Sequence, residues 1–156
     1  MNIREMEQRD LEAVSAICID SFSQSVAGSL SAAGVSTFNN IAASSAFLNR
    51  MQQDNVMFVA ERDGKINGVI ELKEGRHVAM LFVAPECQKQ GVGRALIAAA
   101  LRYARADSVT VKASLSSVAA YEKYGFKCNG GIAETAGLVF QPMEIERSKF
   151  TPSRAL

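Results

Sequence analysis

The chain has 156 residues, of which 48% are hydrophobic and 21% charged, the balance of an ordinary globular domain rather than a disordered chain. Its 17 Lys and Arg residues nearly balance its 16 Asp and Glu residues. The net charge of +1 therefore gives no reason to expect a nucleic-acid or an anionic-membrane surface. No stretch approaches the roughly 18 apolar residues that a membrane-spanning helix needs, so we expect no membrane partner.

Cysteine usage and the N-terminus bear on cellular location. Cys18, Cys87 and Cys128 are scattered without a CxxC pair, and the chain has one histidine, so we expect reduced thiols and no metal site. The first residues, MNIREMEQRD, are charged and are not typical of a secretory signal. These features predict a cytoplasmic protein. The length predicts one domain, over residues 1–147, with a flexible tail over 148–156.

Hydrophobic periodicity predicts the elements of the first half of the chain. A short strand over 2–6 is followed by a helix that starts after Asp10, has apolar residues at helical spacing and ends near Phe22. The Ser-, Ala- and Gly-rich residues 23–46 predict a loop and a second helix. An antiparallel meander then follows, joined by Asp-Gly and Glu-Gly turns, with strands over 56–60, 66–72 and 77–83.

The second half begins with a helix predicted over 91–105, whose apolar stripe includes Leu96 and Tyr103. A β-branched strand over 107–113 follows, so the strand, helix, strand order predicts a parallel crossover. The remaining elements are a short helix that ends at Tyr124-Gly125 and strands over 126–129 and 137–146.

The junction between strand 77–83 and the next helix reads QKQGVG over residues 88–93. The first turn of a helix has four backbone N–H groups without intrahelical partners, and the helix dipole adds positive charge there. Gly91 and Gly93 lack the Cβ atoms that would keep a phosphate from those donors. Because a lone GxG also occurs at helix starts for packing alone, the spacing leaves phosphate binding and packing both open.

Two blocks together resemble a known family. Residues 88–93 match (Q/R)xxGx(G/A), and residues 114–126, SLSSVAAYEKYGF, resemble NxxAxxxYExxGF, the signatures of the GCN5-related N-acetyltransferase (GNAT) superfamily. The resemblance implies an α/β fold with a mixed, mostly antiparallel sheet of six or seven strands flanked by helices, and a cleft where strands 77–83 and 108–113 diverge. It also implies direct acetyl transfer from acetyl-CoA to an amine, without a covalent enzyme intermediate.

The resemblance implies specific contacts with acetyl-CoA. Backbone groups around Leu81, Phe82 and Val83 would pair with the pantetheine arm. The pyrophosphate would lie on the N–H groups of the junction, with charge added by Lys89 and Arg94; the residues are Gln88, Lys89, Gln90, Gly91, Val92, Gly93 and Arg94. Ser114 occupies the position where relatives often have an Asn, and Ser117 the position where they have a small Ala. A cofactor contact at Ser114 would therefore depend on a side chain shorter than Asn.

Tyr121 matches the tyrosine that serves in many relatives as general acid toward the leaving thiolate, and it also completes the cofactor contacts. A packing role on an amphipathic helix is the alternative. A base must deprotonate the acceptor amine, and the candidates are His77, Glu71 or an ordered water chain. Strict alternation places His77, Ala79, Leu81 and Val83 on one face of their strand. Cys87 lacks a neighbouring base, so we expect a packing or loop role for it.

The acceptor is expected to be a small, modestly polar amine or a peptide amine, because the chain has no charged residue from Ser21 to Ser45. A homodimer is compatible with the resemblance. Two other classes remain as alternatives: a non-catalytic module that binds or senses acyl-CoA, and a nucleotide-binding α/β protein. The second fares worse, because no Lys-Ser/Thr pair follows the glycines as in a P-loop.

Overall fold

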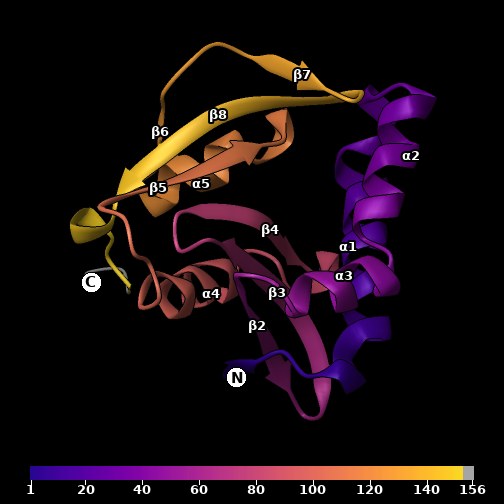
Figure 1. Ribbon diagram of the computed structural model, residues 1–156, viewed down its shortest axis with the longest axis vertical. Helices are drawn as coiled ribbons and strands as arrows, with labels where there is room; N and C mark the ends of the chain where they lie inside the picture. Colours follow the sequence, from indigo (N-terminus) through magenta and orange to yellow (C-terminus); the bar gives the residue numbers. More distant parts are fainter. Residues whose placement is uncertain (153–156) are drawn as a thin grey trace.

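The computed structural model describes residues 1–152 and contains an eight-stranded sheet with helices on both faces (Figure 1). The strand order is β1-β2-β3-β4-β5-β8-β6, and β7 pairs with β8 off this path. The strands are β1 Asn2–Glu5, β2 Asn55–Arg62, β3 Lys65–Lys73, β4 His77–Val83, β5 Ser108–Ala113, β6 Lys127–Cys128, β7 Ala133–Thr135 and β8 Leu138–Glu146. Within residues 1–152 every strand pair is antiparallel except β4–β5, which confirms the predicted mixed, mostly antiparallel sheet and its parallel crossover.

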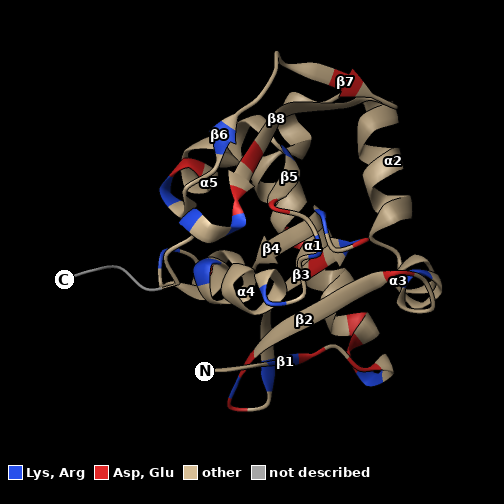
Figure 2. Cartoon of the chain, turned by 60° about the vertical axis from the view of Figure 1, so that its left-hand side comes forward, with Lys and Arg blue, Asp and Glu red and all other residues tan. Residues whose placement is uncertain are grey.

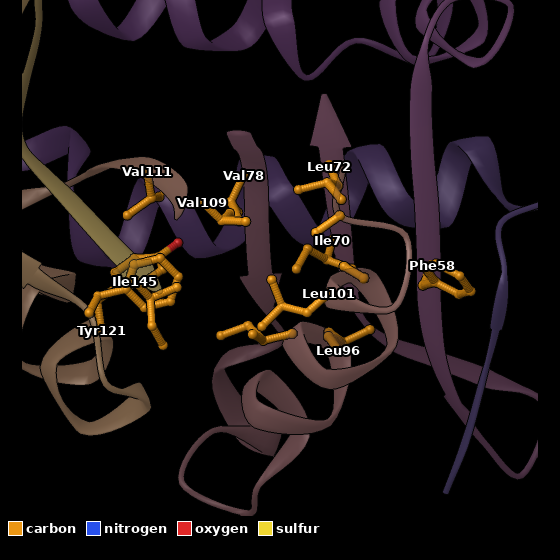
Figure 3. Packing of buried hydrophobic residues seen from close by; sticks show 14 of the residues in the cluster. Phe58, Ile70, Leu72, Val78, Leu96, Leu101, Val109, Val111, Tyr121 and Ile145 are labelled. Atoms are coloured by element: carbon orange, nitrogen blue, oxygen red, sulfur yellow. The ribbon is translucent and has the colours of Figure 1, made fainter. Parts of the chain in front are cut away.

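Helices cover both faces of the sheet and bury two separate apolar clusters. Side chains of α1, α2 and α3 form one cluster with those of β2, β3 and β4. Side chains of α4 and α5 belong to the other cluster, which also contains side chains of β5 and β8 and is shown in part in Figure 3. The helices are α1 Leu11–Ser25, α2 Ala32–Ile41, α3 Ser44–Met51, α4 Val92–Leu101 and α5 Val118–Tyr124. The region 23–46 thus leads into two helices where the sequence predicted one.

The crossover helix α4 differs from its prediction at its C-terminal end. It ends at Leu101 rather than near residue 105. Tyr103, predicted on the buried stripe, is 48% exposed and lies beside Phe58, with ring centroids 5.4 Å apart. The stripe is instead completed by Ile97, Ala100 and Leu101. The helix approaches the sheet closely over Gly68, where a Cβ would meet a methyl of Leu96 at 3.1 Å.

Strands β4 and β5 diverge soon after they begin to pair. Their register contains two residue pairs, His77 with Thr110 and Val78 with Val111. From Met80 onward β4 keeps β3 as its partner, while β5 keeps only β8, with which it pairs along its whole length. The divergence implied by the family resemblance is therefore present, and it leaves one edge of β4 without a strand beside it.

A β-bulge at Ala79 changes which β4 side chains share a face. Leu72 of β3 pairs with Val78, but the preceding residue, Glu71, pairs with Met80, so Ala79 is left without a partner. Val78 consequently packs with Leu81 and Val83 in the cluster under α4, whereas Met80 and Phe82 pack under α1. The alternation expected from the sequence, with His77 and Leu81 on the same face, is wrong because the bulge shifts the strand by one residue.

The end of the described chain contacts α4. Phe150 packs against the α4-side cluster, and the guanidinium of Arg94 donates to the carbonyl of Thr151 at 2.8 Å. The predicted tail over 148–156 lies partly outside the described residues, which end at Pro152. Among residues 1–152, no helix is long and apolar enough to cross a membrane. The same residues contain no group of three or more metal-ligating side chains.

Candidate active site

The free edge of β4 presents backbone groups where β5 has turned away. The N–H of Ala84 donates to the carbonyl of Asn67 at 2.7 Å. In an antiparallel ladder alternate residues bond to the same neighbour, so Phe82 also directs its backbone groups to β3. Leu81 and Val83 therefore direct theirs into the gap. Of the three backbone positions implied by the family resemblance, the fold brings two to the gap and turns Phe82 away.

Two side chains hold the last carbonyl of β4. The hydroxyl of Ser21 in α1 and the amide of Gln88 each donate to the Val83 carbonyl, both at 3.1 Å. Ser21 is buried, and sequence reasoning missed it. A polar residue on the buried stripe of α1, between Cys18 and Phe22, is the signal that could have identified it. Gln88 acts here through its side chain, which ties the start of the signature to the end of the strand.

Between β4 and α4 the backbone presents a row of N–H groups. Within residues 1–152, none of the N–H groups of residues 88–94 donates to another protein atom, and the ladder of α4 begins with Ala95 bonded to Gly91. Lys89 and Gly91 have left-handed backbones, with φ of 63° and 85°. A Cβ on Gly91 would meet nothing within 4 Å. Successive N–H groups in such a turn form a concave anion site, so this segment fits a phosphate group.

Gly93 has a different role from Gly91. A Cβ at this position would overlap the hydroxyl oxygen of Tyr124, so α4 packs against the Tyr124 side chain of α5 in its present position only with glycine at residue 93. Tyr124 in turn meets the Tyr121 ring edge-on, with centroids 5.9 Å apart. The spacing of the motif left ligand binding and packing both open as roles for its glycines. In the structure Gly91 is open to a ligand, and Gly93 is a packing contact.

Arg94 and Lys89 also differ. The Arg94 guanidinium donates to the carbonyls of Lys123, at 2.6 Å, and Thr151, and it lies over the ring of Tyr124 at 5.5 Å. It therefore joins α4 to α5 and to the C-terminal segment. Lys89 lies within the row of N–H groups, and its side chain is exposed. Of the two cations expected near a phosphate, Lys89 is the one whose position suits that contact.

The two serines of the second block bond to each other. The hydroxyls of Ser114 and Ser117 are 2.6 Å apart, and Ser117 also donates to the carbonyl of Ser114 at 3.0 Å. This turn links the end of β5 to the start of α5. The two serine hydroxyls thus form hydrogen bonds within the turn, and each can form one further hydrogen bond.

Tyr121 lies in the core beside the diverging strands. Its side chain is 6% exposed, and its ring meets that of Phe126 edge-on with centroids 5.3 Å apart. Figure 3 shows the hydroxyl oxygen directed away from α5 toward β5 and β4. Burial raises the pKa of Tyr121 above its ordinary value near 10, so the phenol keeps its proton throughout the neutral range.

His77 lies at the paired end of β4. Its Nδ1 is 2.8 Å from the hydroxyl of Thr110, the residue beside it on β5. Leu81 is four residues further on, about 13 Å along an extended strand. Burial lowers the pKa of His77, and the nearby Lys112, Lys73 and Arg76 act in the same direction. The imidazole is therefore neutral at pH 7, but the fold does not bring it to the gap.

Glu71 lies in β3, with β4 between it and the gap. It is 1% exposed, and both of its carboxylate oxygens accept hydrogen bonds from Nε of Arg50 in α3, at 2.9 and 3.1 Å. Burial raises the pKa of Glu71 above its usual value, although Arg50 acts in the opposite sense. Its carboxylate is thus engaged in joining α3 to the sheet, on the face away from Tyr121.

Comparisons by sequence and by structure both find acetyltransferases that are similar to this chain. The Acetyltransferase (GNAT) domain model matches residues 26–147. In sequence, the peptidyl-lysine N-acetyltransferase YiaC of Escherichia coli K12 is 45% identical over 40 residues. That match spans 26% of this chain and 27% of YiaC, so it covers about a quarter of that protein.

Among solved structures, a GCN5-related N-acetyltransferase from Rhodopseudomonas palustris superposes with a TM-score of 0.81 at 23% identity, covering 93% of this chain and 94% of that one. The PaiA N-acetyltransferase of Thermoplasma acidophilum, solved in complex with coenzyme A, gives 0.74 at 20% identity, over 93% and 98% of the two chains. A ribosomal-protein-alanine N-acetyltransferase from Brucella melitensis gives 0.69 at 22% identity, over 94% and 99%. At these identities the likeness establishes the fold.

Proposed function

The chain belongs to the GNAT acetyltransferase family, and on that premise we propose that it transfers the acetyl group of acetyl-CoA directly to a primary amine. The observation that carries the proposal is the continuity of two unpaired stretches of backbone. The free edge of β4 ends at Val83, and the row of unpaired N–H groups begins at Gln88, whose side chain bonds to Val83. One extended ligand with a diphosphate can therefore follow both.

Leu81 and Val83 would hold the pantetheine arm as an added strand. Leu81 offers both an N–H and a carbonyl to the gap, and Val83 offers its N–H, because Ser21 and Gln88 already bond to its carbonyl. The N–H groups of residues 88–94 would take the diphosphate, with Lys89 as the nearby cation. Backbone donors suit this task because they are fixed before the ligand arrives.

Tyr121 would act as the general acid. When the amine nitrogen bonds to the acetyl carbon, the carbon–sulfur bond breaks and the sulfur leaves with its electron pair. The Tyr121 phenol supplies a proton to that sulfur, and solvent later returns one to the phenol. The ordinary pKa of a thiol, about 8.5, lies below that of the phenol, so the proton moves as the carbon–sulfur bond breaks, and the transfer is completed when solvent reprotonates the phenolate.

The acceptor amine must lose a proton before or during attack, and we propose that water removes it. His77 and Glu71 are the protein candidates, but His77 is hydrogen-bonded to Thr110 at the paired end of β4, and the Glu71 carboxylate is held by Arg50. Tyr121 is the one candidate catalytic side chain that lies beside the diverging strands. The relative YiaC is named as a peptidyl-lysine N-acetyltransferase, so lysine is one acceptor to include among the amines tested.

A two-part experiment tests the proposal. Calorimetric titration with acetyl-CoA measures binding, and release of free coenzyme A in the presence of an amine panel measures turnover. We expect both binding and amine-dependent release, with the acetylated amine detected by mass spectrometry. Binding without release for any amine would indicate a non-catalytic acyl-CoA-binding module instead. Absence of binding would contradict the assignment of the β4 edge and the junction.

A further inference from the structure

Arg94 joins three parts of the molecule that are far apart in the sequence. It lies in the first turn of α4, at the end of the row of N–H groups. Its guanidinium donates to the carbonyl of Lys123 in α5 at 2.6 Å and to that of Thr151 at 2.8 Å. It also lies 5.5 Å from the ring centroid of Tyr124 and 5.9 Å from that of Phe150. Figure 2 shows α4 and α5 next to each other, with basic positions on α4 in blue.

The segment that follows β8, residues 147–152, runs over α4, and we call it the strap. Arg147 fixes its start, because its guanidinium donates to the carbonyl of Ala104 at 2.7 Å. Ala104 comes after the end of α4, whereas Arg94 is in the first turn, so the strap is bonded near both ends of this helix. Phe150 packs against the cluster under α4. The strap therefore has a fixed path over α4 rather than a single contact.

Tyr124 lies between the start of α4 and Tyr121. Its hydroxyl oxygen occupies the space where a Cβ of Gly93 would be, so it contacts the first turn of α4. Its ring meets the Tyr121 ring edge-on, with centroids 5.9 Å apart. Arg94 packs on the same Tyr124 ring and bonds to the carbonyl of the preceding residue. A displacement of Arg94 would therefore shift the ring against which Tyr121 packs.

The contacts of Arg94 are those of a residue that joins elements, not of one that waits for an anion. Its two terminal nitrogens already donate to carbonyls, and both bonds would have to break before the guanidinium could turn toward a diphosphate. Arginine suits the joining role because its planar fork presents donors at fixed angles and stacks on aromatic rings. Lys89, by contrast, is exposed within the row of N–H groups.

We propose that Arg94 is a positioning residue for acetyl transfer: held by the strap, it fixes the row of N–H groups relative to Tyr121 without touching the cofactor. The diphosphate would be held at residues 88–94, and the sulfur of the same molecule must come within hydrogen-bond reach of the Tyr121 phenol. The spacing between these two elements then decides how well the proton is transferred. This inference rests on the proposed function and adds the strap, which lies outside both motif blocks, to the parts that the reaction needs.

The first test separates positioning from a direct phosphate contact. Calorimetry measures the Kd for acetyl-CoA, and coenzyme A release at saturating acetyl-CoA measures kcat. For Arg94→Met we expect kcat to fall at least about tenfold, since a misplacement of about 1 Å can cost about 10²-fold, while Kd changes by less than about threefold. A direct contact predicts the reverse, with Kd raised at least about tenfold by the loss of a charge-assisted hydrogen bond and kcat unchanged. That result would overturn the inference.

Three further variants serve as references. Lys89→Met should raise Kd, because Lys89 is the cation proposed beside the diphosphate. Arg102→Met, at an exposed arginine directly after α4, is the matched control and should leave both kcat and Kd unchanged. Arg94→Lys keeps the charge but loses the fork, so its kcat should fall as in Arg94→Met. If Arg94→Met does not fold, Arg94→Lys decides alone, and a wild-type kcat for it overturns the inference.

The second test asks whether Arg94 acts through Tyr121. In a Tyr121→Phe background the acid is already lost, so adding Arg94→Met should lower kcat by less than about threefold. Phe150→Ala loosens the strap and should lower kcat in the same sense as Arg94→Met. The double variant of Arg94 and Phe150 should lose no more than the larger single loss. Equal effects of Arg94→Met with and without the Tyr121 phenol, or a wild-type kcat for Phe150→Ala, would overturn the inference.

Failure of this inference looks different from failure of the proposed function. If the wild-type protein releases no coenzyme A with any amine, the proposed function fails, and the inference fails with it. If the wild type turns over an amine but Arg94→Met changes only Kd, the proposed function stands and the positioning role of Arg94 is wrong.

Discussion

Gly93, in the first turn of α4, lies so close to the phenol oxygen of Tyr124 in α5 that any side chain at residue 93 would overlap it. The motif's two glycines therefore comprise one contact between helices and one open backbone position, at Gly91. Because the overlap involves a single side-chain oxygen, it can be tested by removing that oxygen.

We expect Gly93→Ala to destabilise the fold by about 1–3 kcal/mol, the usual cost of adding a methyl to a packed contact. Combining it with Tyr124→Phe should recover much of this loss, because the phenyl ring lacks the colliding oxygen. Urea unfolding of the two single variants and the double variant measures the coupling. Gly131→Ala is the control for replacing glycine alone. Additive losses in the double variant would contradict the contact.

Tyr121→Phe should lower kcat by about 10² to 10⁴, the range for loss of a general acid, with little change in the KM for acetyl-CoA. Since burial raises the pKa of Tyr121, the wild-type rate should not fall from ionisation of this phenol until the pH exceeds its ordinary value of about 10. Rates measured from pH 7 to 9.5 check this. Tyr103→Phe, at an exposed tyrosine, is the control, and equal rates for Tyr121→Phe and wild type would remove the catalytic assignment.

His77→Gln should leave kcat and its pH profile essentially unchanged, because the imidazole lies at the paired end of β4. Its effect should appear in stability. The pKa of His77 is lowered in the folded state, so the wild type is stabilised above pH 6.5 and loses that stability as the pH falls through the lowered pKa. Between pH 7.5 and 5, urea unfolding should therefore show a smaller loss of unfolding free energy for His77→Gln than for the wild type. A large fall in kcat would restore His77 as the base.

Arg50→Met should cost about 3–5 kcal/mol at pH 7, because it leaves the buried carboxylate of Glu71 without its partner. Adding Glu71→Gln should recover part of this loss. Without Arg50 the pKa of Glu71 should rise further. The single variant Arg50→Met should therefore regain the stability that it lost at neutral pH as the pH falls through that raised pKa toward the usual value of about 4.5.

The matched control for this buried pair is Arg76→Met. Arg76 pairs with Glu74 at 2.7 Å, but both side chains are largely exposed, so its loss should cost no more than about 1 kcal/mol. Equal losses for Arg50→Met and Arg76→Met would show that burial does not make the Glu71 pair important.

Local patterns predicted much of this fold. The strands β2, β3, β4 and β5 and the helices α1 and α5 lie close to their predicted positions, because runs of apolar and β-branched residues bounded by turn residues identify such elements. Strand β7 was missed, since its three residues are all exposed and show no alternation. The bulge at Ala79 was also missed, because it exists through the pairing of β4 with β3 rather than through any residue in β4.

What the sequence determined by itself is the family, because the resemblance depends on two short blocks whose residues are close along the chain. Only the tertiary structure decided which partners the individual site residues contact. Arg94 bonds to Lys123 and Thr151, Glu71 to Arg50, and Ser21 to Val83, and each pair is more than twenty residues apart. Buried polar side chains form hydrogen bonds with the partners that lie beside them in the folded protein, and how the elements pack sets which partners those are.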